Sequence, residues 1–229
     1  MTTAATILLT APDPALVAGL TSLRPGLCVI ALDDPLGPSL PQAGGPMWAF
    51  VDWLLPDLSG LELCRRLREA EPTRAAHLTM VLEGADADAR RRALAAGADD
   101  YIVGPLTPER VVARVEGIAP EQGAHANGQR LRHGELVIDP AAFQARYQGR
   151  VLPLRPNELR LLVHFITHPD QVFSRAGLIR HLGKDGDAID ERTVDVWIGR
   201  LRRGLRAHGA PDPLRTVRSL GYVLDSPQA

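Results

Sequence analysis

Two groups of residues in this chain have the types and spacing that a binding site requires. The first is Asp52, which ends an apolar run and precedes a proline-containing loop and a helical pattern (FVDWLLPDLSGLELCRRLR, 50–68). Open α/β sheets bind their ligands at this end of a strand. The second is a set of seven arginines within residues 192–218, where Asp195 and Asp212 are the only acidic residues. Arginine presents a planar fork that pairs with guanine or phosphate, so this group indicates a nucleic-acid site.

Most of these arginines lie in one predicted helix, DERTVDVWIGRLRRGLR (190–206). Its helical spacing predicts a core-facing stripe made of Val194, Ile198, Leu201 and Leu205. A different face, with its flanks, holds Thr193, Trp197, Arg200, Arg202, Arg203 and Arg206. A basic run alone is equally consistent with a solvated helix surface. The short helix and turn before it favour a helix-turn-helix, and a hairpin at 214–225 adds a wing with two further arginines, Arg215 and Arg218.

The first half of the chain alternates strand-like and helix-like segments. Short apolar runs, typical of strands buried on both faces, occur at 7–10, 28–32, 48–52, 78–82 and 101–103. Helical patterns occur between them at 61–68, 85–96 and 108–118. This alternation predicts a doubly wound α/β fold with a five-stranded parallel sheet. One connection is irregular, because residues 33–46 hold four prolines and three glycines.

The second half has a different pattern, which begins after a polar, glycine-containing segment at 121–130 that we interpret as a linker. Short antiparallel strands are predicted at 135–138, 143–147 and 151–154. Helices follow at 156–167, 174–182 and 190–207, and a terminal hairpin at about 214–224 turns near residues 219–221. The predicted organisation is therefore an α/β domain at 1–120, the linker, and an α+β domain at 131–226.

The charge of the chain is unevenly divided between these halves. The 229 residues carry a formal net charge of −1, but residues 1–120 have a balance of −5 and residues 121–229 a balance of +4. Only one basic residue, Lys184, is a lysine. No apolar run approaches the ~20 residues that span a bilayer, and no signal-peptide pattern follows Met1, so we expect a cytoplasmic protein without a membrane partner. Cys28 and Cys64 are too few for a disulfide scaffold or a zinc site.

The second half closely resembles the winged-helix effector domain of OmpR/PhoB response regulators, particularly the PhoB branch. The matching segments are LRPNELRLLVHFITHPDQVFSRAGLI (154–179), ERTVDVWIGRLRRGL (191–205) and RTVRSLGYVLD (215–225). The resemblance implies a DNA-binding domain with a recognition helix in the major groove and a wing at the adjacent minor groove. It places Arg200 and Thr193 towards DNA, Arg192 and Arg202 at phosphates, and Arg218 with Thr216 on the wing.

This half also departs from the family pattern. Gly199 stands where the PhoB branch often has an arginine, and Trp197 replaces a histidine. The Trp197 ring has two open interpretations, contact with thymine methyl groups or packing within the protein. The loop GKDGDA (183–188) lacks the tryptophan that the PhoB branch uses towards RNA polymerase, which leaves that partner open.

The first half resembles a receiver domain, with Asp52 at the position of the phosphoacceptor and GADDYIVGPLTPERVVARV (97–115) matching the last strand and helix. The family's other phosphoryl-transfer residues are missing. Ala11 and Pro12 replace the acidic pair that holds Mg²⁺, and Gly104 replaces the lysine. The switch hydroxyl aligns with Leu82, or with Glu83 if the register slips. We therefore expect no Mg²⁺, no other cofactor and no enzymatic activity.

The resemblance also implies a symmetric dimer through the receiver domain. Its charged contact residues match Asp99, Asp100 and Arg114, and Arg91 and Arg92 could contribute. Two-fold pairing would place two winged helices on half-sites about one DNA turn apart.

The leading hypothesis is a dimeric, DNA-binding transcription regulator with a degenerate receiver that works without aspartyl phosphorylation. The alternative is a conventional two-component regulator phosphorylated at Asp52. A third possibility is a sensor that binds a small ligand or a protein at the 33–46 loop and the vacated acidic pocket. An aspartyl-phosphate hydrolase is disfavoured because position 54 is leucine where that chemistry needs a second carboxylate. His164 and His168, four apart on one helix, match ordinary effector positions, so we expect no metal site there.

Overall fold

The computed structural model describes residues 5–10, 12–32, 46–84, 86–118, 130–140, 142, 144–184 and 189–226. The chain divides into two compact units, Met1–Val115 and Glu116–Ala229. Several sequence predictions fall on other residues: Ala11, most of the 33–46 loop, all but Arg130 of the linker, and residues 185–188 of the loop before the recognition helix.

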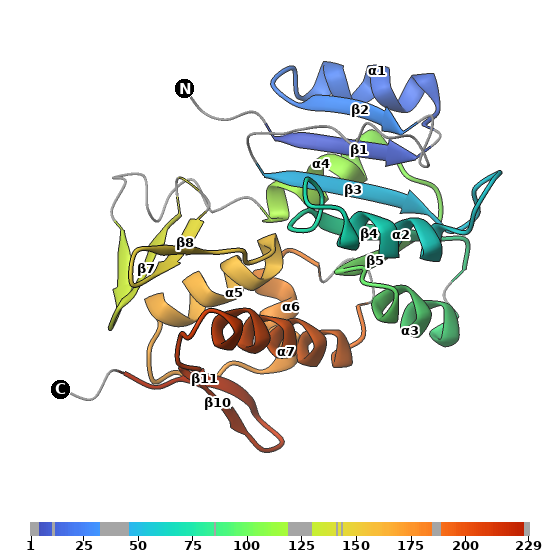
Figure 1. Cartoon of the computed structure of the whole chain (residues 1–229). Coiled ribbons are helices and arrows are strands. Elements are labelled where there is room, and N and C mark those ends of the chain that lie inside the picture. The colour runs from blue at the N-terminus through green and yellow to red at the C-terminus, as the bar shows by residue number, and fades with distance from the viewer. Residues whose placement is uncertain are drawn as a thin grey trace. The chain divides into compact units, whose positions relative to one another are not determined.

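The first unit is a five-stranded parallel sheet, as the sequence predicts, and its strand order is β2-β1-β3-β4-β5 (Figure 1). Its strands are β1 (Thr6–Thr10), β2 (Cys28–Leu32), β3 (Met47–Asp52), β4 (His77–Leu82) and β5 (Asp100–Val103). The order reverses at β1, which pairs with β2 on one side and β3 on the other. β1 and β4 are buried along their whole length and β3 is buried up to Asp52, which explains their nearly continuous apolar sequences.

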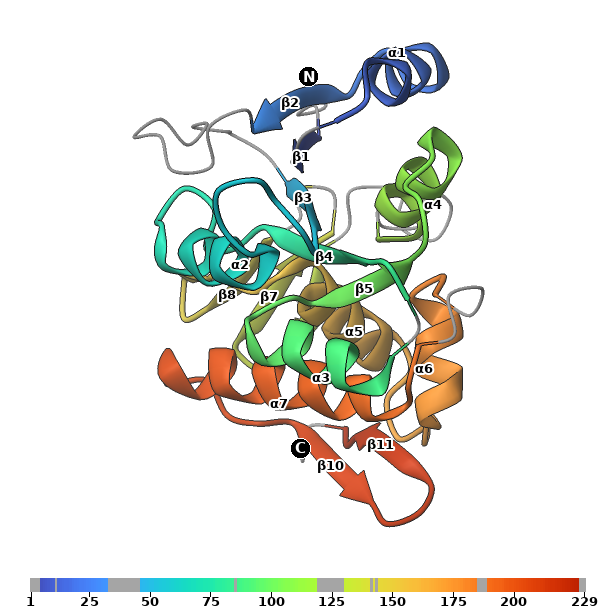
Figure 2. The same cartoon turned by 90° about the vertical axis from the view of Figure 1, so that its right-hand side faces the viewer.

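In the part of the first unit that the structure describes, four helices cover this sheet: α1 (Pro14–Leu23), α2 (Gly60–Glu69), α3 (Ala87–Ala95) and α4 (Pro108–Ile118). α1 and α4 lie on one face, and α2 and α3 lie on the other (Figure 2). α1 is the one helix of the described first unit that the sequence analysis did not predict. Asp13 begins it as an N-cap, since its Oδ1 accepts the Ala15 N–H at 2.9 Å.

The described residues of the second unit form a four-stranded antiparallel sheet, three helices and a terminal hairpin. The sheet contains β6 (Leu131–His133), β7 (Leu136–Asp139), β8 (Gln144–Tyr147) and β9 (Arg150–Leu152), of which β6 was not predicted. The helices are α5 (Pro156–Thr167), α6 (Arg175–His181) and α7 (Arg192–Ala207), and the hairpin joins β10 (Leu214–Val217) to β11 (Gly221–Leu224). This is a winged-helix fold, with α6 and α7 as the helix-turn-helix and β10–β11 as the wing.

Helix α5 is central to the second unit because it contacts α7, β6 and β11. Its side of the core is formed by Leu161, Leu162 and Phe165, none of which is exposed. No helix within the described ranges has the length and apolar character needed to cross a lipid bilayer.

Candidate nucleic-acid interface

Helix α7 presents its predicted core stripe to the interior of the second unit. Val194, Leu201 and Leu205 are 0 % exposed, and Ile198 is 1 % exposed. Burial of this stripe fixes which side of the helix remains outside. Gly199 and Arg200 are partly exposed there, and Arg192, Arg203 and Arg206 are exposed. Of the residues predicted for the arginine-rich face, Arg200, Arg203 and Arg206 therefore reach the outside of α7.

The buried face of α7 is wider than predicted and includes Thr193 and Trp197, each 1 % exposed. The prediction that their side chains face DNA is therefore wrong for this conformation. Both lie next to the apolar stripe in the helical projection, and the Trp197 ring contacts the chain's single lysine, with Lys184 Nζ 5.6 Å from the ring centroid. Of the two interpretations of Trp197, the structure selects packing.

Arg202 connects α7 to the wing and has little of its guanidinium in solvent. Its Nε lies 3.1 Å from Asp212 Oδ2, and Nη2 donates to the Leu214 carbonyl at 3.0 Å and to the Thr216 hydroxyl at 3.1 Å. The side chain is 23 % exposed. In this structure, Arg202 and Thr216, both predicted to contact DNA, hold the recognition helix against the hairpin.

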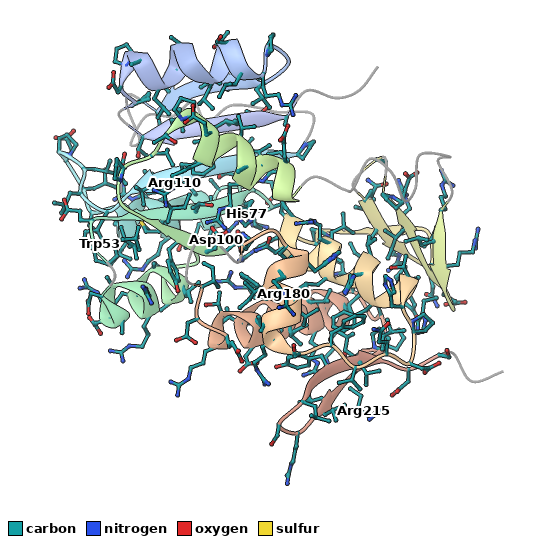
Figure 3. The ribbon with its side chains drawn as sticks, turned by 180° about the vertical axis from the view of Figure 1, so that it is seen from behind. Trp53, His77, Asp100, Arg110, Arg180 and Arg215 are labelled. Carbon is teal, nitrogen blue, oxygen red and sulfur yellow. The ribbon has the colours of Figure 1, made fainter. Side chains whose placement is uncertain are left out.

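The wing carries two arginines with different surroundings (Figure 3 labels Arg215). Arg215 forms a two-point ion pair with Asp225, with Nη2–Oδ1 and Nε–Oδ2 distances of 2.6 and 2.8 Å. Arg218 is exposed in the turn beyond the Val217–Gly221 pair, next to Ser219 with φ of 63°. Among the described residues, no hydrogen bond or ion pair is formed by the Arg218 side chain. Arg218 is therefore the wing arginine that is available to a ligand.

Asp52 lies at the carboxyl end of β3, beside the end of β1. The Thr10 hydroxyl donates to Asp52 Oδ2 at 2.7 Å and accepts the Asp52 N–H at 2.9 Å. Burial raises the pKa of the Asp52 carboxyl, and the hydrogen bond from Thr10 acts in the opposite direction. Thr10 was not among the predicted site residues, although its place at the end of the first apolar run, on the strand next to the one that Asp52 ends, is a usable signal.

The structure places three residues that bear on the predicted loss of phosphoryl-transfer groups near Asp52. Asp13, which follows Ala11 and Pro12 in the sequence, is the N-cap of α1. Leu82 is an apolar residue with 1 % exposure. Gly104 has φ of 86°, a backbone conformation that would strain a lysine at this position.

The predicted dimer residues Asp99, Asp100 and Arg114 form ion pairs within the first unit. Asp100 pairs with Arg114 at 3.1 Å, Asp99 pairs with Arg68, and His77 lies between the two carboxylates with distances of 3.7 and 3.3 Å (Figure 3). The prediction that these three residues offer their charges to a second protomer is therefore wrong in this structure.

The other two dimer candidates are exposed on α3. Arg91 pairs with Asp88 one helical turn away, and the Arg92 guanidinium lies 5.4 Å from the centroid of the Trp53 ring. These two residues remain accessible for an interface on this helix.

Three histidines cluster between α5 and α6 in the second unit. The rings of His164 and His181 stack with a centroid distance of 3.7 Å, and His168 lies 4.9 Å from His164. In the described ranges no three metal-ligating side chains are grouped as a metal site would need. Burial, with Arg160 and His168 nearby, lowers the pKa of His181 from 6.5 to about 4.

We predict that this cluster makes the second unit sensitive to acid. Because the folded protein favours neutral His181, its contribution to stability is complete above pH 6.5 and is lost as the pH falls towards 4. The Tm of the wild type should therefore decrease over this interval, and His181→Gln should show a shallower decrease. Parallel Tm–pH curves for the two proteins would contradict the prediction. Differential scanning calorimetry provides the measurement.

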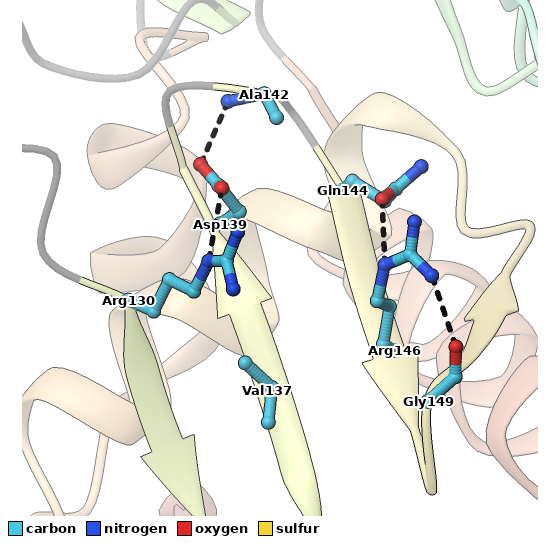
Figure 4. Close-up of a pocket in the computed structure, with 7 residues that line it drawn as sticks. All are labelled: Arg130, Val137, Asp139, Ala142, Gln144, Arg146 and Gly149. Carbon is cyan, nitrogen blue, oxygen red and sulfur yellow. Dashed lines mark hydrogen bonds and ion pairs between the residues drawn. The ribbon is translucent and has the colours of Figure 1, made fainter.

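A pocket of about 380 Å³ lies on the β6–β9 sheet (Figure 4). Arg130 pairs with Asp139 at 3.3 Å, and Arg146 donates to the Gln144 side chain and the Gly149 carbonyl, both at 2.9 Å. The charged groups that line it thus have partners within the lining, and we assign no function to this pocket.

Comparison with known proteins matches both units. The family model "Response regulator receiver domain" matches residues 40–116, and "Transcriptional regulatory protein, C terminal" matches residues 149–224. The chain is 38% identical to the phosphate regulon transcriptional regulatory protein PhoB of Rhizobium meliloti, covering 79% of this chain and 80% of that protein. It is 33% identical to PhoB of Escherichia coli, covering 77% of each. It is 34% identical to the transcriptional regulatory protein CseB of Streptomyces coelicolor, covering 88% of each.

A solved structure supports the fold along the whole chain. A mutant of RitR superposes with a TM-score of 0.61, covering 97% of this chain and 99% of that chain at 20% identity. This similarity concerns the fold alone.

Proposed function

The chain belongs to the OmpR/PhoB family of response regulators, and we propose that it is a sequence-specific, dimeric transcription regulator that does not depend on aspartyl phosphorylation. DNA binding is supported above all by one observation. Arg192, Arg200 and Arg203 lie on the outer side of α7. The apolar stripe on the opposite side is buried in the core, and this packing fixes the orientation of the helix about its axis. An exposed helix face with arginines fits the major groove, and Arg218 on the wing would extend this surface towards the adjacent minor groove.

The test of this proposal is the affinity of Arg200→Ala for a duplex selected from a random library by the wild-type chain. We expect specific binding to weaken by ~1–3 kcal/mol and the preference for one base pair to relax, because a base contact is removed. Arg206→Ala is the matched control, since Arg206 lies on the same helix but pairs with Asp212 at 2.8 Å. Unchanged affinity and base preference in Arg200→Ala would show that α7 does not read the sequence.

Independence from phosphorylation is proposed from the surroundings of Asp52. Phosphoryl transfer to a carboxylate needs a divalent cation and positive groups that stabilise the transferring oxygens. Here the carboxylate is held by Thr10, and neutral residues stand at the switch and lysine positions, Leu82 and Gly104. The oxygen ligands that Mg²⁺ prefers are lacking around Asp52, with Pro12 in place of one acidic residue.

We predict that acetyl phosphate with Mg²⁺ leaves the intact mass of the full chain unchanged. A receiver with complete machinery would gain a stoichiometric adduct of about 80 Da. Asp52→Asn serves as the control and should behave like the wild type. An adduct that forms on the wild type and is absent from Asp52→Asn would establish the alternative, a conventional phosphorylated regulator.

Dimerisation through the first unit is proposed from the family and from the exposed arginines of α3, Arg91 and Arg92. A two-fold dimer would present two α7 helices to half-sites about one turn of DNA apart. Contact with RNA polymerase and ligand sensing by the 33–46 loop remain predictions, since the loops concerned lie mostly outside the described residues.

A further inference from the structure

Tyr222 of the wing contacts the first turn of the recognition helix through its side-chain hydroxyl group. It lies on β11, is 4 % exposed, and donates its phenolic hydrogen to Asp195 Oδ1 at 2.5 Å. Asp195 is in the first turn of α7 and is the only acidic residue of that helix. Burial, together with the hydrogen bond to Asp195, raises the pKa of the Tyr222 phenol, so the hydroxyl stays a donor at neutral pH.

Arg175 adds the third element, α6, to this contact. Its Nε lies 2.7 Å from Asp195 Oδ1, and its guanidinium carbon is 5.2 Å from the centroid of the Tyr222 ring. The Arg202 guanidinium is also over this ring, at 5.7 Å. Two guanidinium groups at such distances attract the ring through its π-electrons. The ring and hydroxyl of Tyr222 therefore bind α6, α7 and the wing together.

Asp195 places a negative charge in the helix that we propose to bind DNA. A carboxylate in the first turn of a helix that approaches DNA phosphates would repel them unless a cation neutralised it. Arg175 supplies that cation, so Asp195 can accept the Tyr222 hydrogen bond without opposing DNA. A neutral side chain at position 195 would be compatible with DNA, but alanine there could not hold the wing.

The backbone of the wing is held separately from this hydroxyl. Phe173 and Tyr222 exchange two backbone hydrogen bonds, with N···O distances of 2.8 and 3.0 Å. Removal of the hydroxyl alone should leave these bonds and the folded hairpin in place. What it removes is the side-chain hydrogen bond between β11 and the first turn of α7, while the bonds from Arg202 of α7 to Leu214 and Thr216 of β10 remain.

We propose that Tyr222 and Asp195 are positioning residues: their hydrogen bond sets the wing relative to the recognition helix, so that Arg218 and the outer face of α7 reach adjacent grooves together. This inference rests on the proposed DNA-binding function. It goes beyond that function by assigning a role to two residues whose side chains need not touch DNA.

A double-mutant cycle on the full chain tests the proposal, with the affinities of wild type, Tyr222→Phe, Arg218→Ala and the double variant measured on the selected duplex. We expect each single variant to weaken binding by about tenfold and the double variant to be no weaker than either, since both remove the same wing contact. Hydroxyl-radical footprinting should show loss of minor-groove protection in Tyr222→Phe, with protection around α7 retained.

Two further variants separate positioning from folding. Asp195→Asn keeps an oxygen that can accept the Tyr222 hydrogen bond, so adding Arg218→Ala to it should still weaken DNA binding. Asp195→Ala has no such acceptor, so adding Arg218→Ala to it should cause no further loss of affinity. The Tm of Tyr222→Phe should stay close to that of the wild type, because the ring remains. Independent, multiplicative effects of Tyr222→Phe and Arg218→Ala, or no effect of Arg218→Ala in the wild type, would overturn the inference. Failure of the wild type to bind any duplex would instead reject the proposed function.

Discussion

Gly221→Ala is expected to destabilise the second unit by at least about 3 kcal/mol and to abolish specific DNA binding. An added Cβ would lie 1.9 Å from the Phe173 carbonyl oxygen, a distance that requires the backbone to move. Position 221 also has φ of 143°, which L side chains rarely adopt. Strain of this kind costs about 1–3 kcal/mol, and the displaced carbonyl weakens a backbone hydrogen bond in addition.

The functional consequence follows from which bond is displaced. The Phe173 carbonyl accepts the Tyr222 N–H at 3.0 Å, and this pair attaches β11 to the segment before α6. Movement at this bond would shift the wing away from the helix-turn-helix. The wing and α7, the two parts of the proposed DNA-binding surface, would then no longer have a fixed position relative to each other. Urea unfolding followed by circular dichroism gives the stability, and fluorescence anisotropy on the selected duplex gives the affinity.

A matched control is available in the same turn. Leu220 is 61 % exposed, and Leu220→Ala should leave both the unfolding midpoint and the affinity close to those of the wild type. A Gly221→Ala protein that unfolds at the wild-type urea concentration would show that the wing attachment tolerates a side chain, and the structural account of this glycine would fail.

In the recognition helix α7, the helical spacing of apolar residues predicted part of the buried face but not all of it. Four apolar residues at helical spacing gave the stripe from Val194 to Leu205, and that stripe is buried. The spacing could not show that α7 is enclosed on a wider arc, because that arc depends on neighbours from distant segments. Lys184, from the loop that precedes the helix, contacts the Trp197 ring. Arg202 pairs with Asp212 and donates hydrogen bonds to Leu214 and Thr216 of the wing.

The same reason explains the outcome in the first unit. Alternating apolar runs and helical patterns were sufficient to predict the parallel sheet, since strands buried on both faces have a distinctive composition. The surroundings of Asp99 and Asp100 were not predictable from their own neighbours, because their partners Arg68 and His77 come from α2 and β4. His77, which begins an otherwise largely apolar buried strand (HLTMVL), was the available indication of a buried polar cluster.

Arg68→Ala is expected to destabilise the first unit by about 3–5 kcal/mol, the cost of leaving a buried charge without its partner. The Arg68 side chain is 9 % exposed and pairs with Asp99, which is 2 % exposed. Its other nitrogen atoms donate to the carbonyls of Gly97 at 2.8 Å, Ala76 at 2.6 Å and Arg74 at 2.9 Å. Alanine removes all of these donors at once, and the carboxylate and the three carbonyls lose a guanidinium that water cannot easily replace.

Arg66→Ala is the control for this prediction, because Arg66 lies two residues away on α2 and pairs with the exposed Glu62 at 3.1 Å, a type of pair that adds little to stability. Urea unfolding of the full chain should show an early transition in Arg68→Ala and a wild-type curve in Arg66→Ala. Adding Asp99→Asn to Arg68→Ala should recover part of the loss, since the unpaired carboxylate is then neutral. Equal unfolding curves for Arg66→Ala and Arg68→Ala would mean that Asp99 does not need Arg68.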